Sequence, residues 1–107
     1  MICRVWRGWA APENAAAYED IVRGQVIPGI EARRIPGFHA IDLIRREVEG
    51  EIEFSTLMWF DDLEAVRRFV GEDYEVAHVP DAARAVLARF DARSVHYDVL
   101  DRRTQNG

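Results

Sequence analysis

The sequence contains only one cysteine, Cys3, and no lysine. The scarcity of the first and the absence of the second each exclude a class of protein. One thiol can form neither an intramolecular disulfide framework nor a thiolate metal cluster. A chain without lysine side chains has no amine there for Schiff-base catalysis. All fourteen basic residues are therefore arginine, whose planar guanidinium favours bidentate pairing with acids in partly buried places.

Long apolar runs and an excess of positive charge are also missing. No stretch approaches the roughly 20 apolar residues of a membrane span. Arg4 and Arg7 interrupt the N-terminal segment, which argues against a signal peptide. The formal net charge of −5 argues against nucleic-acid binding through a basic face. We therefore expect a cytoplasmic protein that binds neither nucleic acid nor membrane.

Apolar residues, in contrast, are abundant for so short a chain. The 107 residues are 49% hydrophobic and include three Trp, five Phe and three Tyr. One domain of this size has a thin core, and self-association is one way to bury the surplus. We predict one domain over residues 1–100, a polar tail over residues 101–107, and a homodimer.

Residue patterns predict the elements in turn. Ile2 to Trp9 alternates like a strand, and a helix begins near Pro12 with an expected kink near Pro28. The apolar stripe of this helix comprises Tyr18, Ile21, Val22, Val26 and Ile30. Phe38 to Glu49 and Glu51 to Phe60 are typical of two strands joined at Gly50 in a hairpin.

The second half of the chain predicts two more helices and a last strand. One helix opens with the segment Asp61-Asp62-Leu63-Glu64, an acidic cap followed three residues later by glutamate, and ends at Gly71. Another begins at Pro80 and carries an apolar stripe of Ala83, Val86, Leu87 and Phe90. Ser94 to Leu100 is the expected final strand. The order indicates an α+β fold of the ferredoxin-like βαββαβ type, with an antiparallel sheet and an extra helix before the last strand.

Apolar residues occur on both faces of the predicted strands, so both faces require cover. We assign Arg4, Trp6, Leu57 and Trp59 to the face that meets a symmetry mate. Arg7, Thr56 and Met58 are assigned to the face that the helices cover.

Five stretches together resemble the antibiotic biosynthesis monooxygenase family of dimeric α/β-barrel proteins. They are ICRVWRGW, VIPGIEARRIPGF, EIEFSTLMWFDDLEAVRRF, GEDYEVAHVP and RFDARSVHYDV, which span most of the chain from Ile2 to about Leu100. The resemblance implies a homodimer whose two sheets pack face to face, with one pocket per subunit between sheet and helices. Some members of the family oxidise polycyclic aromatic compounds to quinones without metal, flavin or haem, and others bind and degrade haem.

The family's site residues match this sequence only in part. Quinone-forming members carry Asn and Trp where Thr56 and Phe60 stand here. Haem-degrading members carry Asn, Trp and His where Arg7, Phe69 and His78 stand, so only the histidine is retained. These departures leave both activities open.

His78 and Arg7 are the candidate catalytic residues. A histidine titrates near neutral pH and serves as acid, base or ligand, although His78 in a purely structural role would cap the last helix or bond a carbonyl. Arg7 would hold an enolate, phenolate or carboxylate if its face lines the pocket, and otherwise pairs with an acid.

A wall of apolar and aromatic side chains would accept a planar aromatic ligand, or else form plain core. Its expected members are Trp9, Thr56, Met58, Phe60, Phe69 and Tyr74. Acidic Glu72, Asp73 and Glu75 are adjacent on one loop, which is typical of a solvated surface, and we expect no metal site.

The family resemblance, taken together with these residues, implies a cofactor-independent monooxygenase that acts on a small polycyclic aromatic or phenolic substrate. Two alternatives remain, a non-catalytic dimer that binds a small ligand and a haem-binding or haem-degrading protein with His78 as axial ligand. Fold alone does not decide among them.

Overall fold

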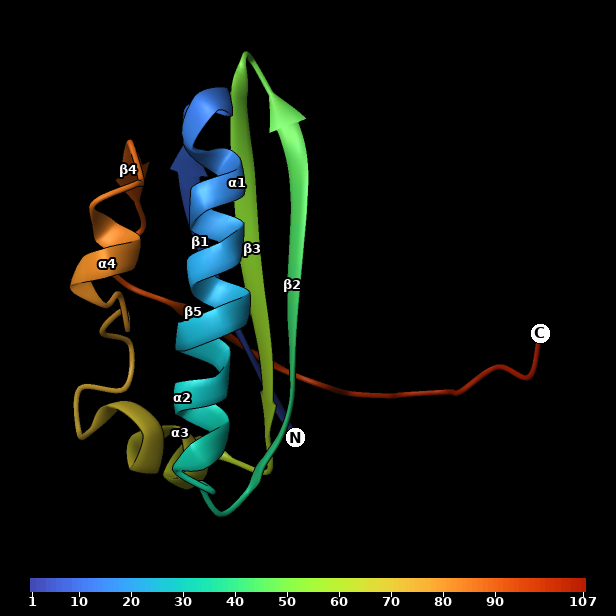
Figure 1. Ribbon diagram of the computed structural model, residues 1–107. Coiled ribbons are helices and arrows are strands. Elements are labelled where there is room, and N and C mark those ends of the chain that lie inside the picture. The colour runs from blue at the N-terminus through green and yellow to red at the C-terminus, as the bar shows by residue number, and fades with distance from the viewer.

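A computed structural model describes all of residues 1–107 and shows one antiparallel sheet with helices on one face (Figure 1). The strands are β1 (Ile2–Ala10), β2 (Phe38–Val48), β3 (Glu51–Phe60), β4 (Arg89–Phe90) and β5 (Val95–Asp98). The helices are α1 (Pro12–Ile21), the π-helical turn η1 (Val22–Val26), α2 (Ile27–Ala32), α3 (Leu63–Val70) and α4 (Asp81–Arg84). None of the helices is long and apolar enough to cross a membrane.

The sheet has the strand order of a ferredoxin-like fold, as predicted. β3 lies between β2 and β1, and both β4 and β5 pair with β1. β5 pairs with Ile2 to Val5, whereas β4 pairs with Gly8 and Trp9. The last strand position of the fold is therefore divided into two short strands on one edge of β1.

The β2–β3 hairpin follows directly from its turn residues. Glu49 and Gly50 are the two residues between the strands, and both have positive φ, 51° and 81°. Two successive positive φ values define the type I′ turn, which matches the twist of the flanking strands and favours glycine.

The first helix continues through Pro28 instead of breaking there. The N–H of Ile27 donates to the carbonyl of Val22, five residues earlier, so the helix widens into a π turn directly before the proline. The predicted stripe faces the sheet: Tyr18, Val22 and Ile30 are buried.

The prediction of a long last helix is wrong. α4 ends at Arg84, and Phe90 belongs to β4 instead of a helical stripe. The main chain leaves the helical path because the N–H of Ala88 donates to the carbonyl of Trp9, and the N–H of Asp91 to that of Arg7. Pairing with the open edge of β1 thus replaces the helical hydrogen bonds.

The two faces of the sheet are defined by the register between β1 and β3. Arg4 is opposite Met58 and Trp6 is opposite Thr56, so these four share the face under the helices, which we call the inner face. Cys3, Val5 and Arg7 are opposite Trp59, Leu57 and Ser55 on the outer face. Our assignment was therefore right for β3 and wrong for β1, because opposed residues in an antiparallel pair point to the same side.

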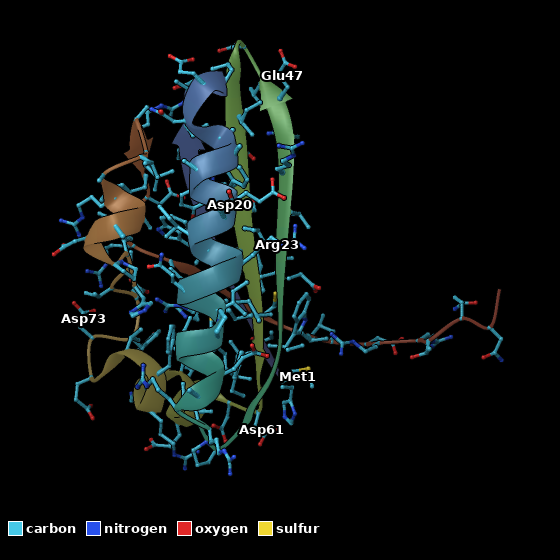
Figure 2. All side chains as sticks on the ribbon, viewed as in Figure 1. Met1, Asp20, Arg23, Glu47, Asp61 and Asp73 are labelled. Atoms are coloured by element: carbon cyan, nitrogen blue, oxygen red, sulfur yellow. The ribbon has the colours of Figure 1, made fainter.

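Two apolar clusters form the core between the inner face and the helices. The first contains Ile2, Ile30, Ile35, Met58, Phe60, Ala65, Val66 and Phe69. The second contains Trp6, Ala10, Ala15, Tyr18, Val22, Phe54 and Ala83. Charged side chains such as Asp20, Glu47 and Asp73 lie outside this layer (Figure 2).

The C-terminal residues leave the sheet and run away from the domain (Figure 1). Residues 99–107 form no helix or strand, and residues 101–107 are all exposed. Arg102 in this tail still packs on the sheet, because its guanidinium lies 5.5 Å from the ring centre of Trp59 on the outer face.

Candidate functional site

A narrow cavity lies between the inner face and the helices, and its walls come from both core clusters. It has about 50 Å³ of water-accessible space and is partly open to solvent. Sixteen residues line it: Arg4, Trp6, Tyr18, Val22, Val26, Ile27, Ile30, Ile41, Thr56, Met58, Phe69, His78, Val79, Pro80, Ala83 and Ser94. Most of them are apolar, so the few polar groups determine what chemistry the cavity offers.

The π-helical turn contributes directly to this wall. Val22 and Val26 belong to the turn, and Ile27 follows it, and all three line the cavity. An extra residue in the helix shifts the angular position of every following side chain. This shift is a local feature of the kind that frequently accompanies functional sites.

Arg4 is the most unusual of the polar residues that line the cavity. It is only 3% exposed, and it donates from Nη1 to the carbonyl of Tyr74 and from Nη2 to the carbonyl of Val76. Burial lowers the pKa of Arg4 to about 10, and no acidic group offsets that effect. The guanidinium is therefore still charged at neutral pH, and main-chain carbonyls alone do not neutralise it.

His96 lies opposite Arg4 on the neighbouring strand β5, on the same inner face, and completes its environment. Arg4 Nη1 lies 3.1 Å from His96 Nε2, and because arginine only donates, Nε2 is the acceptor of a neutral imidazole. Burial and the charge of Arg4 lower the pKa of His96, while Glu75 acts weakly in the opposite direction. Its Nδ1 then carries the proton and has no partner in the protein.

His78 stands at the mouth of the cavity, since it lines the cavity and is also exposed. Its ring is tilted against Phe69 with 5.1 Å between the ring centres. Partial burial, followed by the charges of Arg33 and Arg4, lowers the pKa of His78. His78 is thus predominantly neutral at pH 7 and has a free nitrogen with which to accept a proton.

Phe69 connects the two candidate groups. The guanidinium carbons of Arg4 and Arg33 lie 5.5 Å from its ring centre, and His78 packs on it as well. Two cations near one neutral histidine produce a local positive potential, which favours anionic over cationic ligands.

The structure brings together four of the eight residues that the sequence suggested. Thr56, Met58, Phe69 and His78 line the cavity. Phe60 is fully buried in the core behind it and stacks on Phe69 at 6.0 Å between ring centres.

Tyr74 and Trp9 lie away from the cavity. The ring of Tyr74 packs under Arg67 and against His96, and only its carbonyl contacts Arg4. Trp9 is on the outer face, where Arg89 covers its ring at 4.1 Å.

The expected position of Arg7 is wrong. It lies on the outer face, where its Nε is 3.1 Å from a carboxylate oxygen of Asp91. The alternative we described, an arginine paired with an acid, is what the structure shows. The arginine that lines the cavity is Arg4, three residues earlier on the same strand.

Sequence reasoning missed four cavity residues that carry polar groups or aromatic surface: Arg4, Trp6, Tyr18 and Ser94. The sequence predicted Tyr18 only as part of the helical apolar stripe, and Trp6 only as part of the face that meets a symmetry mate. Arg4 and Arg7 are three residues apart on one strand, so their side chains point to opposite faces. Nothing in the local sequence shows which of these faces the helices cover. Ser94 was predicted as the first residue of the final strand, but it directly precedes β5, and nothing in that pattern indicated a cavity residue.

Comparison with solved structures finds similar proteins, among them the following two. A protein from Bacillus cereus with the provisional name antibiotic biosynthesis monooxygenase superposes with a TM-score of 0.71 and 14% identity, over 100% of this chain and 98% of that one. Rv0793 from Mycobacterium tuberculosis gives a TM-score of 0.57 and 16% identity, over 96% and 98%. The chain has the fold of these proteins.

The ferredoxin-like fold inferred from the sequence is therefore confirmed, and so is the resemblance to antibiotic biosynthesis monooxygenases at the level of fold. No family model and no curated protein matches the chain. At these identities the shared fold does not carry over residues or reaction, which must be argued from the cavity.

Proposed function

We propose that the protein is a cofactor-independent monooxygenase that oxidises a small phenolic or aromatic substrate in this cavity. The observation that supports it best is that two polar groups line the same cavity. One is the buried guanidinium of Arg4, which has no acidic partner, and the other is the neutral imidazole of His78 at the cavity mouth. The provisional name of the Bacillus cereus protein agrees with this class of reaction.

The chemistry assigns one role to each polar group. His78 accepts the proton of a substrate hydroxyl, and the positive field of Arg4 and Arg33 stabilises the phenolate that forms. The phenolate transfers an electron to O2, and superoxide recombines with the phenoxyl radical at a ring carbon that bears a hydrogen. The proton held by His78 returns to the peroxide anion and gives a hydroperoxide. Loss of water then yields a quinone, so that one oxygen atom enters the product and the other leaves as water. Neither metal nor flavin takes part in this scheme.

Oxygen uptake tests the proposal. A panel of phenols, including anthrone-type compounds, should consume O2 faster with the protein than in buffer. His78→Ala should lose most of this acceleration, since a general base contributes about 10²- to 10⁴-fold. His39→Ala is the matched control, because His39 is an exposed histidine that contacts Asp61 away from the cavity. Absence of acceleration across the whole panel would refute the oxygenase.

The narrowness of the cavity favours one second candidate, a non-catalytic module that binds a small aromatic ligand. Such a protein would bind members of the same panel without O2 uptake. A porphyrin does not fit about 50 Å³ beside His78 without rearrangement of the walls, so we do not propose the haem alternative.

We also propose a homodimer formed through the outer face of the sheet. Ile44, Val95 and Tyr97 are 52%, 52% and 57% exposed, and Val5, Leu57 and Trp59 lie between their strands. A contiguous exposed apolar sheet face is typical of an interface. Sedimentation equilibrium should give twice the monomer mass at micromolar concentration, and a monomer throughout would contradict the dimer.

A further inference from the structure

The deep end of the cavity holds a positive charge that no acidic side chain of the protein neutralises. Arg4 takes part in no ion pair, and its contacts are two main-chain carbonyls and a neutral histidine. Its Nε makes no hydrogen bond in the structure. Burying a charge without a counter-ion costs several kcal/mol, so an anionic ligand at this point would recover part of that cost.

Ser94 provides a second, independent sign of a missing ligand atom. Its side chain is 4% exposed and lines the same cavity, yet its Oγ has no hydrogen-bond partner. Unsatisfied buried polar groups are rare in native proteins and require an explanation. A ligand oxygen that accepts from both Arg4 and Ser94 would satisfy each of them.

The remaining walls define the shape of such a ligand. Trp6, Val22, Met58 and Phe69 surround the space beyond Arg4 with apolar surface, and His78 follows at the mouth. The cavity of about 50 Å³ is partly open to solvent, so a single ring enters it with a displacement of the walls, and a fused system would require a larger one. The ligand would thus be anionic at its deep end, apolar in the middle and polar at the mouth.

We propose that the cavity binds a single-ring aromatic carboxylate, with its carboxylate against Arg4 and Ser94 and a ring hydroxyl directed to His78. This inference rests on the proposed function, because it specifies the substrate of the same site. It also narrows the predicted substrate, since a fused polycyclic ligand without an acid group would leave Arg4 unneutralised.

A carboxylate fits Arg4 better than a phenol does. Carboxylic acids ionise near pH 4, whereas phenols ionise near about pH 10. The acid therefore arrives already charged and offers two oxygens to the guanidinium, which prefers such planar, bidentate partners. A phenol hydroxyl would arrive neutral, and it suits His78 at the mouth, where a proton has to be removed.

Calorimetric titration under anaerobic conditions tests the inference without any turnover. The probes are 4-hydroxybenzoate and its neutral methyl ester, together with benzoate and benzamide. We expect the unmodified protein to bind each acid about ten-fold or more tightly than its neutral analogue, as for hydrogen bonds to a charged group. Equal affinity for acid and neutral analogue would overturn the inference.

Variants of the cavity residues test whether the preference for acids over neutral analogues arises in the cavity. Arg4→Met should abolish the discrimination between acid and neutral analogue, and Ser94→Ala should reduce it several-fold. Arg7→Met is the matched control, since it removes an arginine from the same strand but from the outer face, and it should keep the full preference. A preference that survives Arg4→Met in a folded protein would also overturn the inference.

Arg4 also holds the loop at Tyr74 and Val76, so Arg4→Met could fail to fold. Far-UV circular dichroism checks this, and Ser94→Ala together with the unmodified protein then decides the outcome. Failure here differs from failure of the oxygenase. Selective binding of acids without O2 uptake would refute the oxygenase activity and leave the carboxylate preference standing. Equal turnover of neutral and acidic phenols would refute the carboxylate preference and leave the oxygenase activity standing.

Discussion

The two faces of the sheet carry similar residues but differ in what covers them. On the inner face, Phe54, Met58 and Phe60 are buried under the helices. On the outer face, Leu57 and Trp59 of the same strand remain partly exposed. A strand with large apolar side chains on both sides is stable in water only when both sides are covered, so the outer face is the incomplete half of the fold.

The two arginines of β1 show the same contrast for charge. Arg7 on the outer face has a carboxylate partner in Asp91, and nearly half of its side chain is exposed. Arg4 on the inner face is buried and has carbonyl partners only. A paired, solvated arginine is explained by local structure alone, whereas a buried arginine without an acid points to a ligand.

The largest effect is expected from truncating the inner face. Phe60→Ala removes a fully buried ring that contacts Phe38 and Phe69. It should lower the free energy of unfolding by about 3–5 kcal/mol, since deleting a buried ring leaves a cavity. Urea denaturation measures this, with Leu57→Ala on the outer face as the control, under conditions where both proteins are monomeric. Equal losses in the two variants would contradict the distinction between the faces.

A charge on the outer face should act on association instead of folding. Trp59→Glu places a carboxylate at the centre of the proposed interface, and we expect the dimer dissociation constant to rise by about 100-fold or more, as for hot-spot residues. Sedimentation equilibrium measures the constant, and Trp59→Phe should change it far less. A dimer that Trp59→Glu leaves unchanged would place the interface elsewhere.

A smaller effect is expected from pH, through the histidines on either side of Arg4. The pKa values of His78 and His96 are lowered in the folded protein, mainly by burial and, for both, by the charge of Arg4. The unfolded chain therefore binds more protons just below pH 6.5, and the free energy of unfolding should fall as pH decreases through that value.

Urea denaturation between about pH 7.5 and pH 5.5, where histidines titrate before carboxylates, measures this slope. His78→Gln and His96→Gln should each reduce it. A slope that neither substitution changes would show that other groups are responsible.

The smallest effect is expected from the ion pair on the outer face. Arg7→Ala removes a partly exposed pair with Asp91 and should change the free energy of unfolding by about 0–1 kcal/mol. Thermal unfolding at low and high salt measures it. A loss of several kcal/mol would mean that Arg7 is as structurally important as Arg4, and the contrast between the two arginines would then fail.

Much of the fold could be read from local sequence. Gly50 between two alternating segments predicts the hairpin, and the acidic residues Asp61 and Asp62 before an apolar stripe predict α3. In the structure, Asp62 caps the first turn of α3 by accepting from the N–H of Ala65. The prediction of secondary structure failed where hydrogen bonding to a strand distant in the sequence competed with the local preference for a helix. The segment Ala85 to Phe90 has a helical pattern, yet β1 accepts hydrogen bonds from the N–H groups of Ala88 and Asp91 and pairs with Arg89 and Phe90 as a short strand.

The sequence predicted the type of site, an apolar pocket that contains a histidine, but it did not predict which arginine lines it. His78, Phe69 and Thr56 line the cavity, so an apolar pocket with a histidine was correctly expected in these places. The arginine was misplaced from Arg4 to Arg7. The alternation of β1 separates its two faces, but it contains no information on which of them lies beside which face of β3.

The sequence by itself thus determined the strands other than β4, the hairpin, most of the helices and the presence of apolar residues on both faces of the sheet. The tertiary structure alone decided which face of β1 the helices cover. Forty residues lie between the end of β1 and the start of β3, so no turn sets their register, and a shift of one residue exchanges the two faces. That register places Arg4, and not Arg7, beside the cavity.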